Sequence, residues 1–336
     1  MPSAAAELGR YTSFLTSRVI PELDDHRAEF WSGSEWFDSL DEPRDGISSA
    51  WWLAKGDRSS WFAVVANLGL AYCLRRGLRD HFRRRFQSIP AKDVSHARAH
   101  AERRSASFPI WEILSELVAA AFVEGALGWR YASHEPPGHQ MARGDWEFVT
   151  HEGCSVFIEV KTLGEWVHGE WVGIRPSYSS RLSAVLKRAY RQLPRDRPTL
   201  VIIVGTNSEI LRMPFGLLHS DLFEAFFGRT IVRMKFDGVQ ATDPSMGPSF
   251  RNMFVQRQKH SRLGAAIALN LRGLEAPRPE FYGITNPFAR PESALPSLAL
   301  SPLTRFVVEG SEGRIVQGAE PEALWNRILE ARLWRP

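Results

Sequence analysis

The chain has 336 residues, of which 44% are hydrophobic and 24% charged, so it is a folded globular protein and not a disordered one. This length corresponds to about two domains, or to one domain with large additions. The two cysteines, Cys73 and Cys154, exclude a disulfide framework and a zinc site built on cysteines. The net charge of +4 is compatible with a polyanionic partner without requiring one.

No stretch predicts secretion or insertion into a membrane. The first residues lack the basic segment and long apolar run of a signal peptide. The most apolar stretch, residues 61–74, is too short to span a bilayer. Because free cysteines suit a reducing compartment, we expect a cytoplasmic protein that does not associate with membranes.

Residues 1–105 predict a helical N-terminal region. Residues 8–20 carry apolar side chains at helical spacing, and a proline ends the pattern. Residues 59–86 predict one long helix, or two helices joined near Gly69 or Gly77. Trp51 and Trp52 fit a core role better than stacking on nucleic-acid bases.

Six arginines follow in the second half of the 59–86 stretch. Arg75, Arg79 and Arg83 recur every four residues, so in a continuous helix they would share one face. A solvated outer face explains this pattern, and so does a surface that binds the phosphates of a nucleic acid.

Residues 106–336 predict a second region in which helices and strands alternate. The apolar run TLVIIVG at residues 199–205 is typical of a strand buried on both faces. The hydrophobic period predicts helices at residues 108–128, 181–193, 217–227 and 321–334, and strands at 145–150, 154–162, 199–205, 230–236, 263–271 and 280–285. Residues 238–250 and 286–302, rich in Pro, Ser and Gly, predict loops.

The strands at residues 145–150 and 154–162 predict a hairpin. A three-residue turn with Gly153 in the left-handed conformation is a common hairpin loop. This turn sets Asp145 opposite Glu159. Strand alternation then gives one mostly apolar face and one face with charge at the end away from the turn. The apolar face holds Trp146, Phe148, Cys154, Val156, Ile158 and Val160, and the other holds Asp145, Glu147, Ser155, Phe157, Glu159 and Lys161.

Two carboxylates directly opposite each other lie about 5 Å apart at Cβ and repel. A hard divalent cation between Asp145 and Glu159 would offset this repulsion, since Mg²⁺ favours one or two carboxylates together with waters and a substrate phosphate. Lys161, on the same face, would hold the attacking water or stabilise the negative charge of the transition state. These groups suffice for hydrolysis of a phosphodiester.

The order of these residues resembles the PD-(D/E)xK nuclease superfamily, whose pattern is a helix with Glu, a strand with Asp, a strand with Glu-x-Lys, a helix and a further strand. Over residues 108–206 this chain shows Glu116 within SELVAAAFVEG, Asp145, Glu159-Val160-Lys161, the segment KRAYRQL and TLVIIVG in that order. One departure is Gly144, which stands where the pattern has proline.

The resemblance implies a restriction-endonuclease-like α/β fold, with a mixed central sheet flanked by helices, and a nuclease that uses Mg²⁺ or Mn²⁺ and acts on DNA. It implies that Asp145, Glu159 and the Val160 carbonyl bind metal and that Lys161 is the catalytic lysine. It further implies that Glu116 is an auxiliary ligand or hydrogen-bonding partner and that Gln192 lines the site.

Several alternatives stay open. Glu124 would replace Glu116 if the helix presented another face, and Glu147 would be a further ligand. His134, His139 and His151 flank the hairpin, where loop histidines usually face solvent. A catalytically silent module that binds nucleic acid is the second reading of the chain, although the intact Asp145, Glu159 and Lys161 argue against it. A regulatory protein whose N-terminal helices bind a protein partner is the third, and a homodimer is compatible with all of them.

Overall fold

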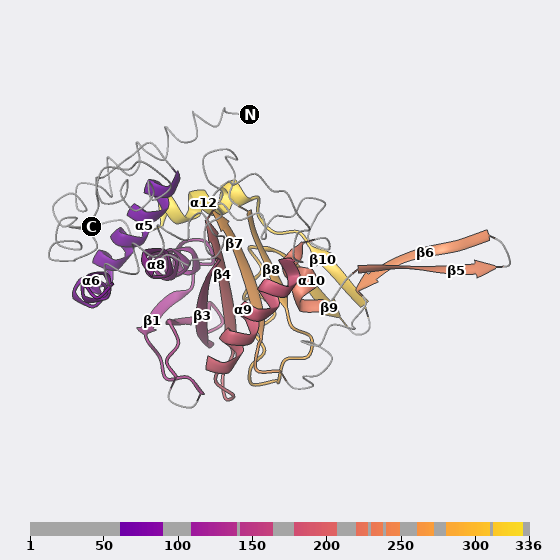
Figure 1. Ribbon diagram of the computed structural model, residues 1–336, viewed down its shortest axis with the longest axis horizontal. Helices are drawn as coiled ribbons and strands as arrows, with labels where there is room; N and C mark the ends of the chain where they lie inside the picture. Colours follow the sequence, from indigo (N-terminus) through magenta and orange to yellow (C-terminus); the bar gives the residue numbers. More distant parts are fainter. Residues whose placement is uncertain are drawn as a thin grey trace.

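The computed structural model describes residues 61–89, 109–139, 142–163, 178–206, 220–227, 230–237, 240–248, 261–271, 280–309 and 312–331. In these residues, six helices and ten strands form a mixed α/β structure around one eight-stranded sheet (Figure 1). The helix predicted at residues 8–20, Trp51 and Trp52 lie outside the described residues.

The sheet has the strand order β1-β2-β3-β4-β7-β8-β9-β10. Its three middle neighbours β3, β4 and β7 run parallel, β8 and β9 are also parallel to each other, and every other pair is antiparallel. The strands are β1 (Arg130–His134), β2 (Trp146–Val149), β3 (Ser155–Leu163), β4 (Thr199–Thr206), β7 (Ala265–Leu271), β8 (Glu280–Thr285), β9 (Thr304–Glu309) and β10 (Glu312–Val316). A separate hairpin, β5 (Thr230–Asp237) and β6 (Gln240–Pro248), extends from the body of the protein (Figure 1).

Helices cover both faces of the sheet. On one face, α9 (Tyr178–Gln192) and α10 (Asp221–Phe227) bury their apolar sides, and α9 makes the crossover that parallel strands β3 and β4 require. On the other face lie α5 (Trp61–Arg75), α6 (Arg79–Gln87), α8 (Pro109–Gly125) and α12 (Pro321–Glu330). Buried residues of α5 and α6 belong to the same hydrophobic core as those of α8. The described part of the helical N-terminal region therefore packs directly on the α/β region.

The central strand β4 explains the apolar run TLVIIVG. Leu200, Ile202 and Val204 enter the core under α8, and Val201 and Ile203 enter the core under α9. The strand is therefore buried on both faces, as predicted, because parallel strands flank it and helices cover it. The helices and strands predicted between residues 108 and 206 are confirmed within a few residues at their ends.

Four strands were not predicted. The predicted loop at residues 238–250 is wrong for β6, whose sequence QATDPSMGP contains two prolines and a glycine, because its pairing with β5 outweighs its composition. β1 has no apolar alternation and forms because β2 offers it an edge. β9 and β10 form the opposite end of the sheet as a hairpin.

The arginine-rich stretch forms two helices, and Gly77 joins them. Gly77 has a φ of 66°, its N–H donates to the Leu74 carbonyl, and the Leu78 N–H donates to the Cys73 carbonyl. These bonds end a helix with a left-handed glycine. The prediction that Arg75, Arg79 and Arg83 share one helix face is therefore wrong for Arg75, which ends α5 while the other two lie on α6.

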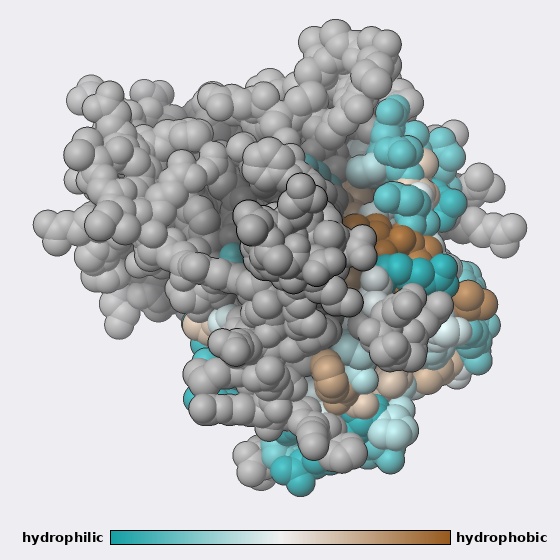
Figure 2. Space-filling model, turned by 90° about the vertical axis from the view of Figure 1, so that its right-hand side faces the viewer, coloured by the Kyte–Doolittle hydropathy of each residue, from teal (hydrophilic) through white to brown (hydrophobic). Residues whose placement is uncertain are grey.

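On the face shown in Figure 2, hydrophobic and hydrophilic residues are interspersed over the part that the structure describes. Among the described residues, the large hydrophobic side chains that are exposed are Phe288 and Leu298. None of the helices in the described ranges combines the length and the apolar composition needed to cross a bilayer.

Candidate active site

The β2–β3 hairpin has the predicted register. Trp146 pairs with Ile158, and the Thr150 N–H donates to the Cys154 carbonyl across 2.9 Å. Gly153 has a φ of 78°, which is the left-handed conformation that the turn requires. Asp145 comes immediately before β2, so it lies just beyond the last pair of this register, Trp146 with Ile158. The pairing of Asp145 with Glu159 therefore stays a prediction.

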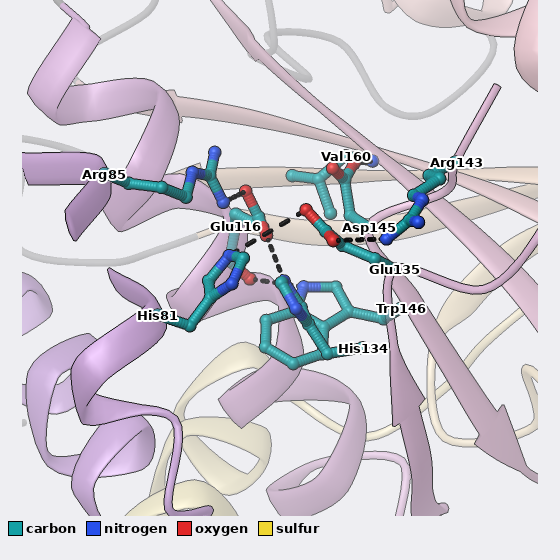
Figure 3. A network of polar contacts seen from close by, with 9 residues as sticks. All are labelled: His81, Arg85, Glu116, His134, Glu135, Arg143, Asp145, Trp146 and Val160. Atoms are coloured by element: carbon teal, nitrogen blue, oxygen red, sulfur yellow. Dashed lines mark hydrogen bonds and ion pairs between the residues drawn. The ribbon is translucent and has the colours of Figure 1, made fainter. Parts of the chain in front are cut away.

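Immediately before β2 begins, the backbone and the side chain of Asp145 form hydrogen bonds with the edge of β3. Its N–H donates to the Ile158 carbonyl at 3.1 Å, and its Oδ2 accepts the Val160 N–H at 2.6 Å (Figure 3). In a strand the N–H and C=O of one residue point toward the same neighbour, so the Val160 carbonyl lies on this edge as well. The side chain of Asp145 therefore bonds the Val160 N–H at the point where the strand pairing stops, on the same edge as the Val160 carbonyl.

Glu159 is a buried carboxylate in the middle of a core strand, with a side chain only 1% exposed. Its Oε1 accepts a hydrogen bond from Lys161 Nζ, whereas its Oε2 has no hydrogen-bond partner among the described residues. Burial raises the pKa of Glu159 to about 7, against the effect of Lys161. Burying a carboxylate with an unpaired oxygen is costly, and a cation at this oxygen would offset the cost.

Negative charge accumulates around Asp145. Burial raises the pKa of Asp145 well above its ordinary value, and the neighbouring carboxylates Glu116 and Glu159 raise it further, while the Val160 N–H and Lys161 lower it. The oxygens of Asp145, Glu159 and Val160 are the kind of donors that Mg²⁺ prefers. We call these three groups the carboxylate site.

Glu116 reaches this region from α8, on the other face of the sheet. Its Oε2 accepts a hydrogen bond from Arg85 at 2.6 Å, and its Oε1 lies 2.9 Å from Nε2 of His134 (Figure 3). Both oxygens of Glu116 therefore have partners. Of its two predicted roles, this geometry fits a hydrogen-bonding partner and not a metal ligand. The predicted orientation of α8 is confirmed, because its core-facing positions are buried: Ile113, Leu117, Ala120 and Ala121.

Three other sequence candidates lie apart from the carboxylate site. Glu124 pairs with Arg76 and accepts a hydrogen bond from Tyr72, so it does not take the place of Glu116. Glu147 accepts from Ser133 at 2.9 Å, from Ser155, and from Arg197 at 3.3 Å. Gln192 is the last residue of α9, and within the described ranges no hydrogen bond joins its side chain to a carboxylate of the site.

The glycine before Asp145 has a packing reason. A Cβ at Gly144 would lie 2.2 Å from the ring of Phe157, which is buried in the core under α9. The Gly144 N–H also donates to the Pro136 carbonyl at 2.9 Å, a bond that proline cannot make. The departure from the proline of the superfamily pattern therefore follows from local packing.

Sequence reasoning missed a group of residues beside Glu116. His81, His134 and Glu135 each offer a ligand atom, and these atoms lie within 4.8 Å of one another; in the described part of the chain no other three His, Cys, Asp or Glu do so. We call this group the histidine cluster. The expectation that the loop histidines face solvent is wrong for His134, whose side chain is 8% exposed. His81, which lies in the arginine-rich segment, was not predicted as a site residue. Only the fold brings α6 to β1, so the sequence held no signal for this group.

Some arginines of the predicted basic surface form ion pairs within the protein. Arg85 pairs with Glu116, and Arg76 pairs with Glu124, so two of the six arginines bind carboxylates of α8. Arg79 lies 3.5 Å from Asp80 in an exposed pair. These inward contacts fix α5 and α6 against α8 next to the candidate site.

Comparison of the chain with models of protein families, with curated proteins and with solved structures found no match.

Proposed function

We propose that this chain is a metal-dependent nuclease that hydrolyses phosphodiester bonds, with DNA as its substrate. The observation that carries the proposal is the carboxylate site, in which the buried Glu159 keeps one oxygen unpaired and lies near enough to Asp145 to raise the pKa of that carboxyl. Lys161 follows two residues later on the same face of β3 and already contacts Glu159. A surface ion pair between Glu and Lys would not bury the carboxylate in this way.

The order of elements supports a restriction-endonuclease-like fold. The helix α8 carries Glu116, β2 follows Asp145, β3 carries Glu159 and Lys161, and α9 crosses over to the buried parallel strand β4. This is the arrangement that the PD-(D/E)xK superfamily implies for its catalytic core. The flanking strands from β7 to β10 and the helices α5, α6 and α12 would be additions to that core.

Asp145, Glu159 and the Val160 carbonyl would hold Mg²⁺ or Mn²⁺. When bound, such an ion polarises a phosphoryl oxygen and lowers the pKa of water. The protein supplies the rest. The Val160 N–H fixes the orientation of Asp145, and burial keeps bulk water away from Glu159.

Lys161 is the residue that we assign to the transition state. Its side chain is 23% exposed, so it lies between the buried Glu159 and solvent, where a phosphate group would approach. From this position its ammonium group can orient the attacking water and offset the negative charge that develops on the phosphorus oxygens.

One observation favours a second candidate, a nuclease-fold module that binds nucleic acid without cutting it. Glu116 is engaged by Arg85 and His134, and the carboxylates of Glu116, Asp145 and Glu159 do not form one group within 4.8 Å in the described structure. Mg²⁺ needs only one or two carboxylates, so this arrangement does not remove the first candidate.

The deciding experiment incubates the purified full chain with supercoiled plasmid and with single-stranded DNA in Mg²⁺, in Mn²⁺ and in a chelator. We expect nicking that requires the cation and is lost in Lys161→Ala. The matched control is Lys187→Ala, an exposed lysine on α9, which should cut like the parent. Loss of cleavage in Lys161→Ala but not in Lys187→Ala excludes a contaminating nuclease and a general effect of removing a lysine. No cleavage by the parent protein, or equal cleavage by Lys161→Ala, would contradict the proposal.

A further inference from the structure

We propose that the histidine cluster is a second metal site, selective for Zn²⁺ and separate from the carboxylate site. This inference does not rest on the proposed nuclease function, because it concerns other residues and other donor atoms. It is supported by the position of the three side chains, by the shape of the backbone that presents them, and by the groups that hold them.

The three side chains converge on one point. The rings of His81 and His134 lie 4.5 Å apart between centroids, at an angle of 73°. His81 Nε2 is 3.8 Å from Glu135 Oε1, too far for a hydrogen bond, and it has no hydrogen-bond partner among the described residues although it is shielded from solvent. A polar atom buried in this way needs a partner, and a cation between the two residues would supply one.

The backbone around Glu135 is built to bring these side chains together. The pairing of β1 with β2 shifts by one residue between Tyr131 and Ser133, which turns the end of β1. Glu135 follows with a φ of 53°, and it is the one residue other than glycine with a positive φ in the described part of the chain. Its N–H donates to the Asp145 carbonyl at 3.1 Å. An unfavourable conformation held by a neighbouring strand is common at functional sites.

Further contacts orient the ligands from outside. Nη1 of Arg143 donates to Glu135 Oε2 at 3.1 Å, which leaves Oε1 directed at His81 (Figure 3). Glu116 engages one ring nitrogen of His134 and leaves the other for a cation. A carboxylate that holds the far nitrogen of a metal-binding histidine is the usual second layer of contacts at zinc sites. The rings of Phe82 and Trp146 pack against His134 and limit its rotation.

The donor set decides which cation fits. Two imidazole nitrogens and one carboxylate oxygen suit Zn²⁺, which takes three protein ligands and leaves a fourth position for water or substrate. Mg²⁺ prefers oxygen donors, as in the carboxylate site, and binds histidine poorly. The donors of the histidine cluster therefore favour a different cation from the one proposed for the carboxylate site. Glu116 lies between the two regions, since its charge acts on Asp145 and its Oε1 contacts His134.

The test measures Zn²⁺ binding by the metal-free full chain, by isothermal titration and by competition with a coloured chelator. We expect one Zn²⁺ per chain, bound with a dissociation constant below about 10 µM, a free energy of roughly −7 kcal/mol or more favourable. His81→Gln and Glu135→Gln should each weaken binding by at least about tenfold, on the scale of losses known for altered metal sites. Replacement of Zn²⁺ by Co²⁺ should give visible absorption bands typical of low coordination number, and these should disappear in both variants.

His139→Gln is the matched control, because His139 lies in the same loop region but outside the cluster. It should bind Zn²⁺ like the parent, and so should Asp145→Asn, which alters only the carboxylate site. Melting curves without metal show whether each variant is folded. If His81→Gln does not fold, Glu135→Gln alone tests the cluster. The proposal is overturned if the parent binds no Zn²⁺ below about 100 µM, which is a weak free energy of roughly −5 kcal/mol. Equal binding by a folded cluster variant and by the parent, or loss of binding in Asp145→Asn alone, would also overturn it.

Discussion

The carboxylate site and the histidine cluster are neighbours, yet they differ in burial, in donor atoms and in how they could be recognised. Glu159 lies inside a core strand, where it is buried and its Oε1 accepts a hydrogen bond from Lys161. The histidine cluster lies at the end of an edge strand, is partly exposed and offers nitrogen as well as oxygen. Neighbouring polar residues can therefore offer donor sets that suit different cations, when some lie on a buried strand and others at the end of an edge strand.

Glu116 lies between the two regions and contributes to both. Its negative charge raises the pKa of Asp145, but its two oxygens contact Arg85 and His134. Glu116 therefore acts on the carboxylate site through its charge and on the histidine cluster through a direct contact. The following experiments test whether the two regions are as separate as this geometry indicates.

The largest effect is expected from Lys161→Ala. The rate of cleavage should fall at least about a hundredfold, because a donor that acts on transition-state charge contributes this much. DNA affinity should change little, since an interaction made only in the transition state does not contribute to ground-state binding. Single-turnover kinetics and equilibrium binding measure the two quantities separately.

His134→Gln is the counterpart of this change in the histidine cluster. If the carboxylate site performs the chemistry, this variant should retain most of the cleavage activity. A loss as large as that in Lys161→Ala would show that the reaction depends on the histidine cluster and would contradict the proposed division of roles.

A smaller effect, in stability, is expected from Asp145→Asn. At a Mn²⁺ concentration of 100 times its dissociation constant, a bound ion stabilises the folded state by about 2.7 kcal/mol. For a chain of this size that corresponds to a rise in melting temperature of about 4 °C. Asp145→Asn should lose this rise. Its metal-free melting temperature should not fall, because asparagine still accepts the Val160 N–H and removes one of three mutually repelling charges.

The matched comparison is the same Mn²⁺ titration on His81→Gln, which should keep the full rise in melting temperature. An equal loss in both variants would mean that one cation occupies both regions. An unchanged response in Asp145→Asn would exclude this residue from the Mn²⁺ site.

The pH dependence of stability gives a further test. The pKa of Glu159 in the folded protein is about 7, above its ordinary value of 4.5, so neutral Glu159 favours the folded state. This stabilisation is complete below pH 4.5 and is lost as the pH rises through 7. Mn²⁺ requires the ionised carboxylate, so its stabilising effect should grow over the same interval. Glu159→Gln should melt with a weaker dependence on pH and should show no Mn²⁺ effect. An unchanged pH profile in this variant would show that Glu159 is not the source of the pH dependence.

The sequence predicted the buried part of this molecule well, for a physical reason. The register of β2 and β3 follows from a three-residue turn with Gly153, and the face of α8 follows from its apolar period. These local rules place Glu159 next to the start of β2 and turn the apolar face of α8 toward the core. No similar rule places His81 near Glu135, because a helix boundary at Gly77 and a bulge in β1 determine that contact.

The arginines show the same limit in another form. A spacing of four residues places side chains on one face only while the helix continues, and the sequence left open whether it ends at Gly77. The left-handed glycine ends α5, so Arg75 and Arg79 belong to different helices. The predictions failed where tertiary contacts, and not local preference, decide the end of an element.

The smallest effect is expected from the arginines of α6, the helix that also carries His81. Arg79→Ala with Arg83→Ala should weaken DNA binding similarly for all sequences and should reduce the slope of log affinity against log salt by roughly one for each lost phosphate contact. Arg75→Ala, at the end of α5, should be measured alone, because it no longer shares their helix. Arg188→Ala, an exposed arginine on α9 across the sheet, is the control and should leave the slope unchanged. A reduced slope in the α6 variants alone would place the nucleic acid on the side of the histidine cluster, next to the Arg85 and Glu116 pair. If instead the slope is the same in all variants, these arginines form a solvated outer face, and the approach of DNA to the carboxylate site must use another surface.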